Sequence, residues 1–172
     1  AGIINIVTKR PNRGSFNANA TLTVGTNNKY DGGLSLNFGQ EKVNYYASYN
    51  ARSRERWRRG TEDRLTLLPD TTFRVVQQYD GEDLSVSHIV QVGADINLTE
   101  TTTLGAGGIW TWRDKNRQRT YDNLFLSVTD ETLEDFQQTL DRDEATQVQE
   151  YFMNFTHNFA QKGQKLTFNT TY

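Results

Sequence analysis

The sequence predicts an all-β fold, namely an antiparallel transmembrane β-barrel of which this chain holds an incomplete sector of about seven strands. Three observations lead to this prediction. Apolar and polar residues alternate with a period of two in one segment after another. The connections between these segments alternate between tight turns and long charged stretches, and the composition is too polar for a sealed protein core. A barrel wall in lipid satisfies all three, because it needs an apolar band on one face of a single sheet and no enclosed core.

The composition and charge exclude several classes of protein. Apolar residues make up 35% of the 172 residues, and the mean hydropathy is −0.75. The formal net charge is −2, which leaves no overall basic footprint for nucleic acid. The absence of cysteine excludes disulfide frameworks and thiolate metal sites. No apolar run reaches the roughly 18 residues that a membrane helix requires, and no signal peptide opens the chain.

The alternation is clearest in the segment 85–98, where Val90 and Val92 fall on an apolar face and Gln91 falls on a polar one. Phe152 breaks the rule in one of the later segments. Each expected strand is close to the roughly 9 to 11 residues that a tilted strand needs to cross a bilayer. The expected strands are 15–25, 30–38, 43–52, 85–98, 101–113, 147–159 and 165–172, of which the last is cut off.

Short and long connections alternate along the chain, as they do in bacterial barrels with short periplasmic turns and longer outer loops. If strand 15–25 runs outward, the tight turns all fall on one side and the long loops on the other. The expected tight turns are Gln40-Glu41, Thr99-Glu100 and Gln161-Lys162-Gly163. The expected long loops are 54–84 and 115–144, which share their side with the short connection Thr26-Asn27-Asn28.

The chain opens with Ala1-Gly2-Ile3-Ile4-Asn5-Ile6-Val7-Thr8-Lys9-Arg10-Pro11. This segment resembles the end of the plug domain of TonB-dependent outer-membrane receptors, which typically reads Gly-Val/Ile-Ile-Asn-Ile-Val/Ile-Thr-Lys. In that family the final plug strand passes directly into the first barrel strand. Here a first barrel strand is expected from Ser15, and the rest of the chain is similar to the family's polar, Asn-rich barrels by pattern.

The resemblance implies a division of the chain and a function. Residues 1–11 would be the last strand of the plug domain, and residues 12–172 the N-terminal part of the barrel, truncated at its C-terminus. The whole protein would import a bulky nutrient, such as a siderophore, glycan, vitamin or peptide, across the outer membrane of a Gram-negative bacterium. Its implied partners are outer-membrane lipid, the TonB complex through the missing plug region, and a surface lipoprotein. No nucleic acid partner, cofactor or enzymatic activity is expected.

Two alternatives remain open at this point. One is a passive barrel, either a porin or a surface adhesin, which would lack the plug that the opening segment resembles. The other is a soluble β-sandwich binding module, which would bury the apolar faces of two sheets against each other. Lipid exposure of Val92 and Ala106 would separate a barrel from a sandwich. Conversely, Leu104, Val90 and Tyr45 pointing together into a closed protein interior would contradict a barrel.

The candidate ligand-binding residues are Arg52, Arg54, Arg56, Trp57 and Arg58. Guanidinium groups with an aromatic neighbour could bind an anionic or sugar-like ligand. They could equally bind lipopolysaccharide phosphates, or pair with Glu55, Glu62 and Asp63. These last two interpretations, taken together, are favoured.

Other residues that suggest chemistry have simpler explanations. His88 and His157 fall in different strands and have no ligand at metal-binding spacing, so no metal site is expected. The glycines within 105–108 lack the Lys-Ser/Thr of a phosphate loop, and inward glycines would instead relieve crowding. The acidic run 141–144 lacks the spacing of a calcium loop and is expected to be a solvated loop face. No nucleophile, base and orienting group can be assembled from these motifs.

Overall fold

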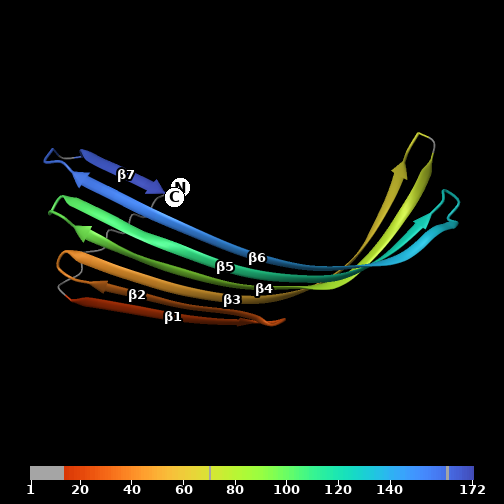
Figure 1. The fold of residues 1–172 in the computed structure, drawn as a ribbon, viewed down its shortest axis with the longest axis horizontal. Helices are drawn as coiled ribbons and strands as arrows, with labels where there is room; N and C mark the ends of the chain where they lie inside the picture. Colours follow the sequence, from red (N-terminus) through yellow and green to blue (C-terminus); the bar gives the residue numbers. More distant parts are fainter. Residues whose placement is uncertain (1–13, 70, 162) are drawn as a thin grey trace.

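The computed structural model describes residues 14–69, 71–161 and 163–172, and they form a single antiparallel sheet of seven strands in chain order. Figure 1 shows the sheet as one curved layer, in which the four long central strands bend away from the rest at one end. No helix among the described residues is long and apolar enough to cross a membrane. The strands are β1 Ser15–Gly25, β2 Lys29–Gly39, β3 Val43–Leu67, β4 Thr72–Asn97, β5 Thr102–Leu126, β6 Thr132–Asn158 and β7 Lys165–Thr171.

The predicted all-β antiparallel architecture and its seven strands are confirmed. The sheet is not closed, since β1 and β7 each pair on one side only within the described part of the chain. The predicted plug strand at residues 1–11, and Lys162 of the third predicted turn, lie outside the described residues.

The predicted long loops at 54–84 and 115–144 are wrong. The β3–β4 ladder continues without interruption from Arg54 opposite Ser85 to Leu67 opposite Thr72, and β5 and β6 pair in the same way up to Leu126. The four central strands are therefore 25 to 27 residues long. The physical reason is that both faces of these extensions are polar. Side-chain alternation between oil and water is absent there, although the backbone pairing is complete.

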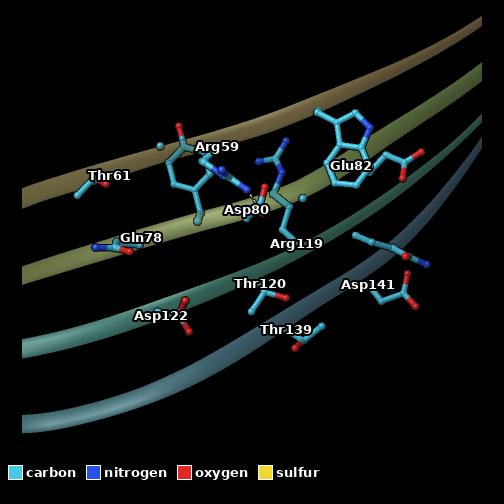
Figure 2. A pocket seen from close by; sticks show the side chains of 15 residues that line it. Arg59, Thr61, Gln78, Asp80, Glu82, Arg119, Thr120, Asp122, Thr139 and Asp141 are labelled. Carbon is cyan, nitrogen blue, oxygen red and sulfur yellow. Dashed lines mark hydrogen bonds and ion pairs between the residues drawn. The ribbon is translucent and has the colours of Figure 1, made fainter. Parts of the chain in front are cut away.

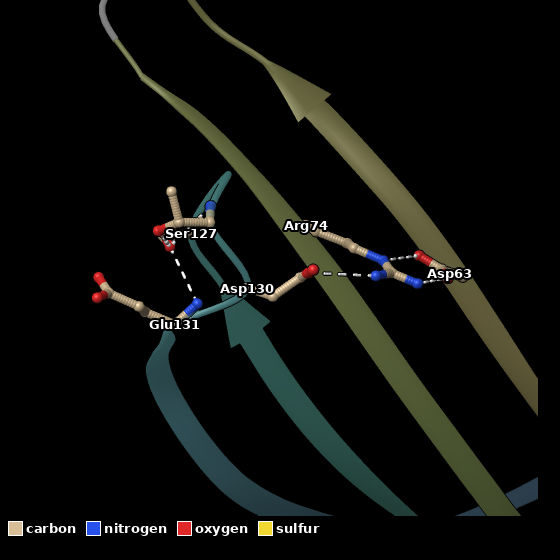
Figure 3. A network of polar contacts seen from close by, with 6 residues as sticks. Asp63, Arg74, Ser127, Asp130 and Glu131 are labelled. Atoms are coloured by element: carbon tan, nitrogen blue, oxygen red, sulfur yellow. Dashed lines mark hydrogen bonds and ion pairs between the residues drawn. The ribbon is translucent and has the colours of Figure 1, made fainter.

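Only the tips of the two long hairpins are turns. At one tip Leu68 and Thr71 exchange backbone hydrogen bonds, and at the other the Ser127 hydroxyl accepts hydrogen bonds from the amides of Thr129 and Glu131 at 3.2 and 3.1 Å. The two tips are joined through Arg74 (Figure 3), which donates to Asp63 at 2.8 Å and to Asp130 at 3.4 Å.

The predicted sidedness of the connections is confirmed (Figure 1). The β2–β3, β4–β5 and β6–β7 turns lie at one end of the sheet, and the β1–β2, β3–β4 and β5–β6 turns lie toward the other. The β1–β2 turn contains Asn27 and Asn28 with φ of 60° and 49°. Asparagine tolerates this left-handed region better than other residues with a Cβ, which explains why it ends the hairpin.

The register brings the predicted faces of all strands together. One row across the sheet runs Ala20, Leu34, Tyr49, Val90 and Trp110, each opposite the next on the neighbouring strand. We call this side the apolar face and its opposite the polar face. The polar face carries Asn, Thr, Ser and Gln side chains at the alternate positions of the same strands.

The apolar face is not packed into a protein core. Among the described residues only Val75 and Leu126 are buried hydrophobic side chains, and both lie near the hairpin tips. Tyr45 and Val92 remain 48% and 45% exposed, and Val90 and Leu104 are only partly covered. The sheet therefore does not form a two-layer sandwich with itself, and its apolar side chains line an open surface.

Glycines on the polar face make room for aromatic rings of the neighbouring strand. Phe152, which breaks the alternation, lies opposite Gly107, where a Cβ would approach its ring to 2.6 Å. Tyr46 in the same way covers Gly93, which is its cross-strand partner. The prediction that glycine relieves crowding is confirmed at Gly107, and Gly93 is a further example that the sequence analysis did not single out.

The apolar band has a defined upper limit. On β3, β4 and β5 it covers residues 43–51, 86–97 and 102–112, close to the roughly 9 to 11 residues that a tilted strand needs to cross a bilayer. On β6 it ends earlier, at Tyr151, because Gln149 and Gln147 lie on the same side of the sheet. We take the row formed by Ser53, Val86, Asp114 and Ala145 as the boundary. Beyond this row the same side of the sheet carries mainly Glu, Asp, Gln and Thr, with Trp57 and Leu84 as exceptions, so the four long strands continue as a hydrophilic extension.

Candidate functional site

Two rows of cations line the polar face where the extension begins. Within 52–58 of β3 every second residue is an arginine, and within 113–119 of β5 every second residue is an arginine or lysine. The register places all of these side chains on the same face. The rows are parallel and lie one strand apart, on either side of β4. We call them the basic ladder: Arg52, Arg54, Arg56 and Arg58 on β3, and Arg113, Lys115, Arg117 and Arg119 on β5.

Small side chains separate the two rows. Ser87 of β4 lies between Arg52 and Arg113, and Ser85 lies between Arg54 and Lys115. The next two rungs have Asp83 and Gly81 at the β4 position, between Arg56 and Arg117 and between Arg58 and Arg119. The rungs repeat about every 6.7 Å along the strands, and the two rows are about 10 Å apart. The result is a trough with cationic sides and a floor of short residues.

Asp83 is the buried centre of this trough, with only 7% of its surface exposed. Arg58, Arg117 and Arg119 make ion pairs with its carboxylate at 3.0, 3.3 and 2.9 Å. Burial alone would raise the pKa of Asp83, but the hydrogen bond from Arg119 and the charges of the three arginines outweigh it and hold the pKa below its usual value. A single carboxylate is thus shared by three guanidinium groups, which leaves net positive charge around it.

The other carboxylates at this level are also shared. Asp31 of β2 accepts hydrogen bonds from Arg52 at 2.8 Å and from Arg54 at 3.0 Å. Glu144 of β6 is paired with Lys115 at 4.0 Å and with Arg142 at 2.7 Å. Each acid on this part of the polar face therefore faces two or more cations.

Part of the cationic charge has no carboxylate partner within the described residues. No ion pair to a described residue is found for Arg56 or Arg113, and both are exposed. In addition, the Nε atoms of Arg54 and Arg119 are buried without a hydrogen-bond acceptor in this part of the chain. Buried donors without acceptors are costly, so the ladder is suited to an anion that supplies acceptor oxygens.

The structure brings four of the five predicted ligand-binding residues together and separates the fifth. Arg52, Arg54, Arg56 and Arg58 share the polar face, whereas Trp57 lies on the opposite face, where its indole donates to Glu55 at 2.9 Å. Trp57 therefore does not belong to the arginine cluster, because adjacent residues of a strand point to opposite sides, and its part in ligand binding stays a prediction.

The expected internal pairing of these arginines is also wrong. They pair with Asp31 and Asp83, while Glu55 accepts from Asn28 and Trp57, and Asp63 pairs with Arg74. The sequence interpretation overlooked the β5 row altogether. A signal was present, since Arg113, Lys115, Arg117 and Arg119 repeat the same period of two.

The opposite face carries the opposite charge at the same level. An open hollow of about 820 Å³ lies there. Figure 2 shows side chains that line it, among them Arg59, Asp80, Glu82, Asp122 and Asp141. Arg59 pairs with Asp80 at 2.9 Å, and burial together with neighbouring Glu55 raises the pKa of Glu82. The extension is thus acidic on the side continuous with the apolar face and basic on the side continuous with the polar face.

The remaining predicted features fall into ordinary structural roles. His88 lies on the apolar face and hydrogen-bonds the Tyr49 hydroxyl at 2.8 Å. The run 141–144 is not a loop but part of β6, with Asp141 on the acidic side and Arg142 on the basic side. Within the described ranges no group of three or more His, Cys, Asp or Glu residues could hold a metal ion.

No protein-family model, curated protein or solved structure matches the chain. The interpretation of the site therefore rests on its geometry.

Proposed function

We propose that this chain forms the N-terminal sector of the barrel wall of a TonB-dependent outer-membrane transporter, which imports a bulky nutrient and has no catalytic activity. In this proposal the apolar face contacts lipid and the polar face lines the lumen. The hydrophilic extension projects beyond the membrane on the outer side.

One observation carries the proposal. A single sheet presents an apolar surface across all seven strands; on β3, β4 and β5 this surface ends close to one row, and on β6 it ends at Tyr151. Half-exposed Val92, Tyr49 and Tyr45 would be unfavourable in water, but they suit a lipid surface. Antiparallel pairing satisfies the backbone groups between strands, as hydrocarbon requires.

The sidedness of the turns adds independent support. The tight turns lie at the end of the sheet where the apolar band begins, and the extension lies at the opposite end (Figure 1). Bacterial barrels have this asymmetry between periplasmic and outer ends. The active-importer part of the proposal rests on the resemblance of residues 1–11 to a plug strand.

Spin labels test the assignment of the faces in the full-length protein reconstituted in lipid bilayers. Labels at Val92 and Ala106 on the apolar face should be accessible to oxygen dissolved in lipid and shielded from a water-soluble relaxation agent. Matched labels at Gln91 and Thr111 on the polar face should show a weaker lipid signal. A dry, doubly inaccessible environment at both Val92 and Ala106 would contradict the barrel and favour a soluble module.

Binding to the periplasmic domain of TonB separates an active importer from a passive barrel. The full-length protein should bind purified TonB domain, and binding should disappear when the segment preceding the barrel is deleted. A correctly inserted barrel that fails to bind TonB would favour a porin or adhesin.

A further inference from the structure

The basic ladder contains more like charge than the fold needs. Cations two residues apart on one strand lie about 6.7 Å from each other, and like charges this close repel. Among the described residues, the carboxylates paired with these cations at this level of the polar face are Asp31, Asp83 and Glu144, and each is shared by two or more cations. Arg56 and Arg113 add charge without forming any ion pair to a described residue. A structural role in holding strands together does not require them.

The geometry of the ladder favours a linear anion over a compact one. Four rungs at this spacing span about 20 Å along β4, with a cation on each side of every rung. A small anion would contact one rung and leave the others unused. An extended chain with an anionic group on successive units could place one group near each rung, and the short side chains of Ser85 and Ser87 leave room for it.

The chemistry of the cations favours an anion with paired oxygens. All but Lys115 are arginines, whose planar forks bind the oxygens of carboxylate, sulfate or phosphate groups with paired hydrogen bonds. Arg117 and Arg119 flank the β4 floor, and the buried Nε atom of Arg119 lacks an acceptor in this part of the chain. Asp83 fixes these guanidinium groups in place while neutralising only part of their charge.

Aromatic rings follow the last rung on the same face. Tyr79 and Tyr121 are cross-strand partners directly beyond Gly81 and Arg119, with ring centroids 6.1 Å apart and ring planes inclined by 44°. Tyr79 also covers Gly60 of β3. Partly exposed tyrosine rings provide an apolar surface with a polar edge, which suits the face of a sugar ring better than a phosphate chain.

We propose that the basic ladder is a binding track for a linear acidic oligosaccharide that carries carboxylate or sulfate groups on successive sugars. The inference rests on the proposed function, because it takes the polar face to line the lumen of a transporter. It deepens that function by naming the class of nutrient.

The test uses the full-length protein in lipid nanodiscs and a fluorescent heparin-derived tetrasaccharide, which carries both carboxylates and sulfates. Binding is measured by fluorescence anisotropy at several salt concentrations. The wild type should bind this probe, and the affinity should fall steeply with salt because several ionic contacts form. A neutral tetrasaccharide with the same label should bind at least about tenfold more weakly.

The decisive variant is the double substitution Arg56→Gln and Arg113→Gln. These residues hold no carboxylate in the described part of the chain, so their removal should leave the fold intact and weaken probe binding by on the order of tenfold or more. The matched control is Arg59→Gln, which removes an arginine from the opposite face next to the ladder. It should change the affinity less than about twofold.

Three outcomes overturn the inference. Unchanged probe binding by the double variant would exclude the ladder as the site. Equal binding of the neutral tetrasaccharide, or of a polyphosphate with the same charge, would overturn the assigned ligand class. Lack of probe binding in a sample whose Val92 label reports lipid contact would overturn the binding track alone, whereas a Val92 label without lipid contact would overturn the proposed function.

Discussion

Val92 lies in the middle of the apolar face, and replacing it by arginine should destabilise the inserted protein by about 2 to 4 kcal/mol. The magnitude follows from its depth. Val92 is midway between the upper limit of the band at Val86 and the β4–β5 turn after Asn97. An arginine there would need to reach across about 20 Å of strand to the upper boundary, which is further than the side chain extends.

The neighbours of Val92 cannot shelter the charge. Its cross-strand partners on the apolar face are Ala47 and Gly108, which are too small to cover a guanidinium group, and Val92 itself is 45% exposed. Leu84 is the next residue of β4 on this face beyond Val86. Leu84→Arg should lower the free energy of unfolding by no more than about 1 kcal/mol, because that position faces water in the proposed arrangement.

The assay is urea unfolding of the full-length protein from lipid vesicles, followed by the loss of heat-resistant migration in gel electrophoresis. The control is Gln91→Arg, whose side chain leaves the polar face beside Ser48 and Ile109 and should change the free energy of unfolding by less than about 0.5 kcal/mol. Equal destabilisation by Val92→Arg and Gln91→Arg would refute the assigned faces, and equal destabilisation by Val92→Arg and Leu84→Arg would refute the position of the band.

Three further predictions concern the sheet itself. Gly93→Ala should lower the free energy of unfolding by about 1 to 3 kcal/mol, because the added Cβ would clash with Tyr46. Gly32→Ala, whose Cβ would meet open space, should lower it less, and urea midpoints measure both variants. Asn27→Val should cost about 1 to 2 kcal/mol at its positive φ, and Asn27→Gly should be tolerated in the same assay. The pKa of Asp83 in the folded protein lies below the ordinary 3.8, so the stabilisation that its ionised carboxylate gives the fold is complete above about pH 4 and is lost as the pH falls through the lowered pKa. Asp83→Asn should therefore reduce the loss of stability on acidification, measured by urea titration at each pH.

The sequence predicted the parts of the fold in which the two faces of a strand differ. The strands around Val90, Leu104 and Tyr49 were identified because their side chains alternate between apolar and polar, and the register confirmed that these faces coincide. The turns were identified as the short stretches between these alternating segments, and the positive φ of Asn27 and Asn28 agrees with the preference of asparagine for tight connections.

The extension was not predicted because apolar and polar side chains do not alternate there. Around Trp57, Asp80 and Gln118 both faces are hydrophilic, so the segment has the composition of a loop although its backbone is fully paired. The alternation of charge sign was the usable signal. Arg56 and Arg58 leave one face while Glu55 leaves the other, and this period of two distinguishes a strand from an irregular loop.

The candidate site was predicted only in part, for a related reason. A run of neighbouring residues in the sequence was taken as one cluster, which joined Trp57 to arginines that lie on the other side of the sheet. The β5 row belongs to the site only through the β3–β4–β5 register, and Asp83 becomes its centre only when three strands are aligned. Such alignments depend on pairing between distant segments, which local patterns do not specify.

The most direct test of the account is a spin-label scan along β4 in the full-length protein in bilayers, from Gln78 to Ile96. We expect oxygen accessibility to alternate with a period of two between Val86 and Ile96, with maxima at the even-numbered residues of the apolar face. From Glu82 to Gln78 the even-numbered residues should instead be accessible to the water-soluble agent. Uniform water accessibility along the whole strand, or maxima at the odd-numbered residues, would contradict the claim that the apolar face of β4 contacts lipid up to Val86.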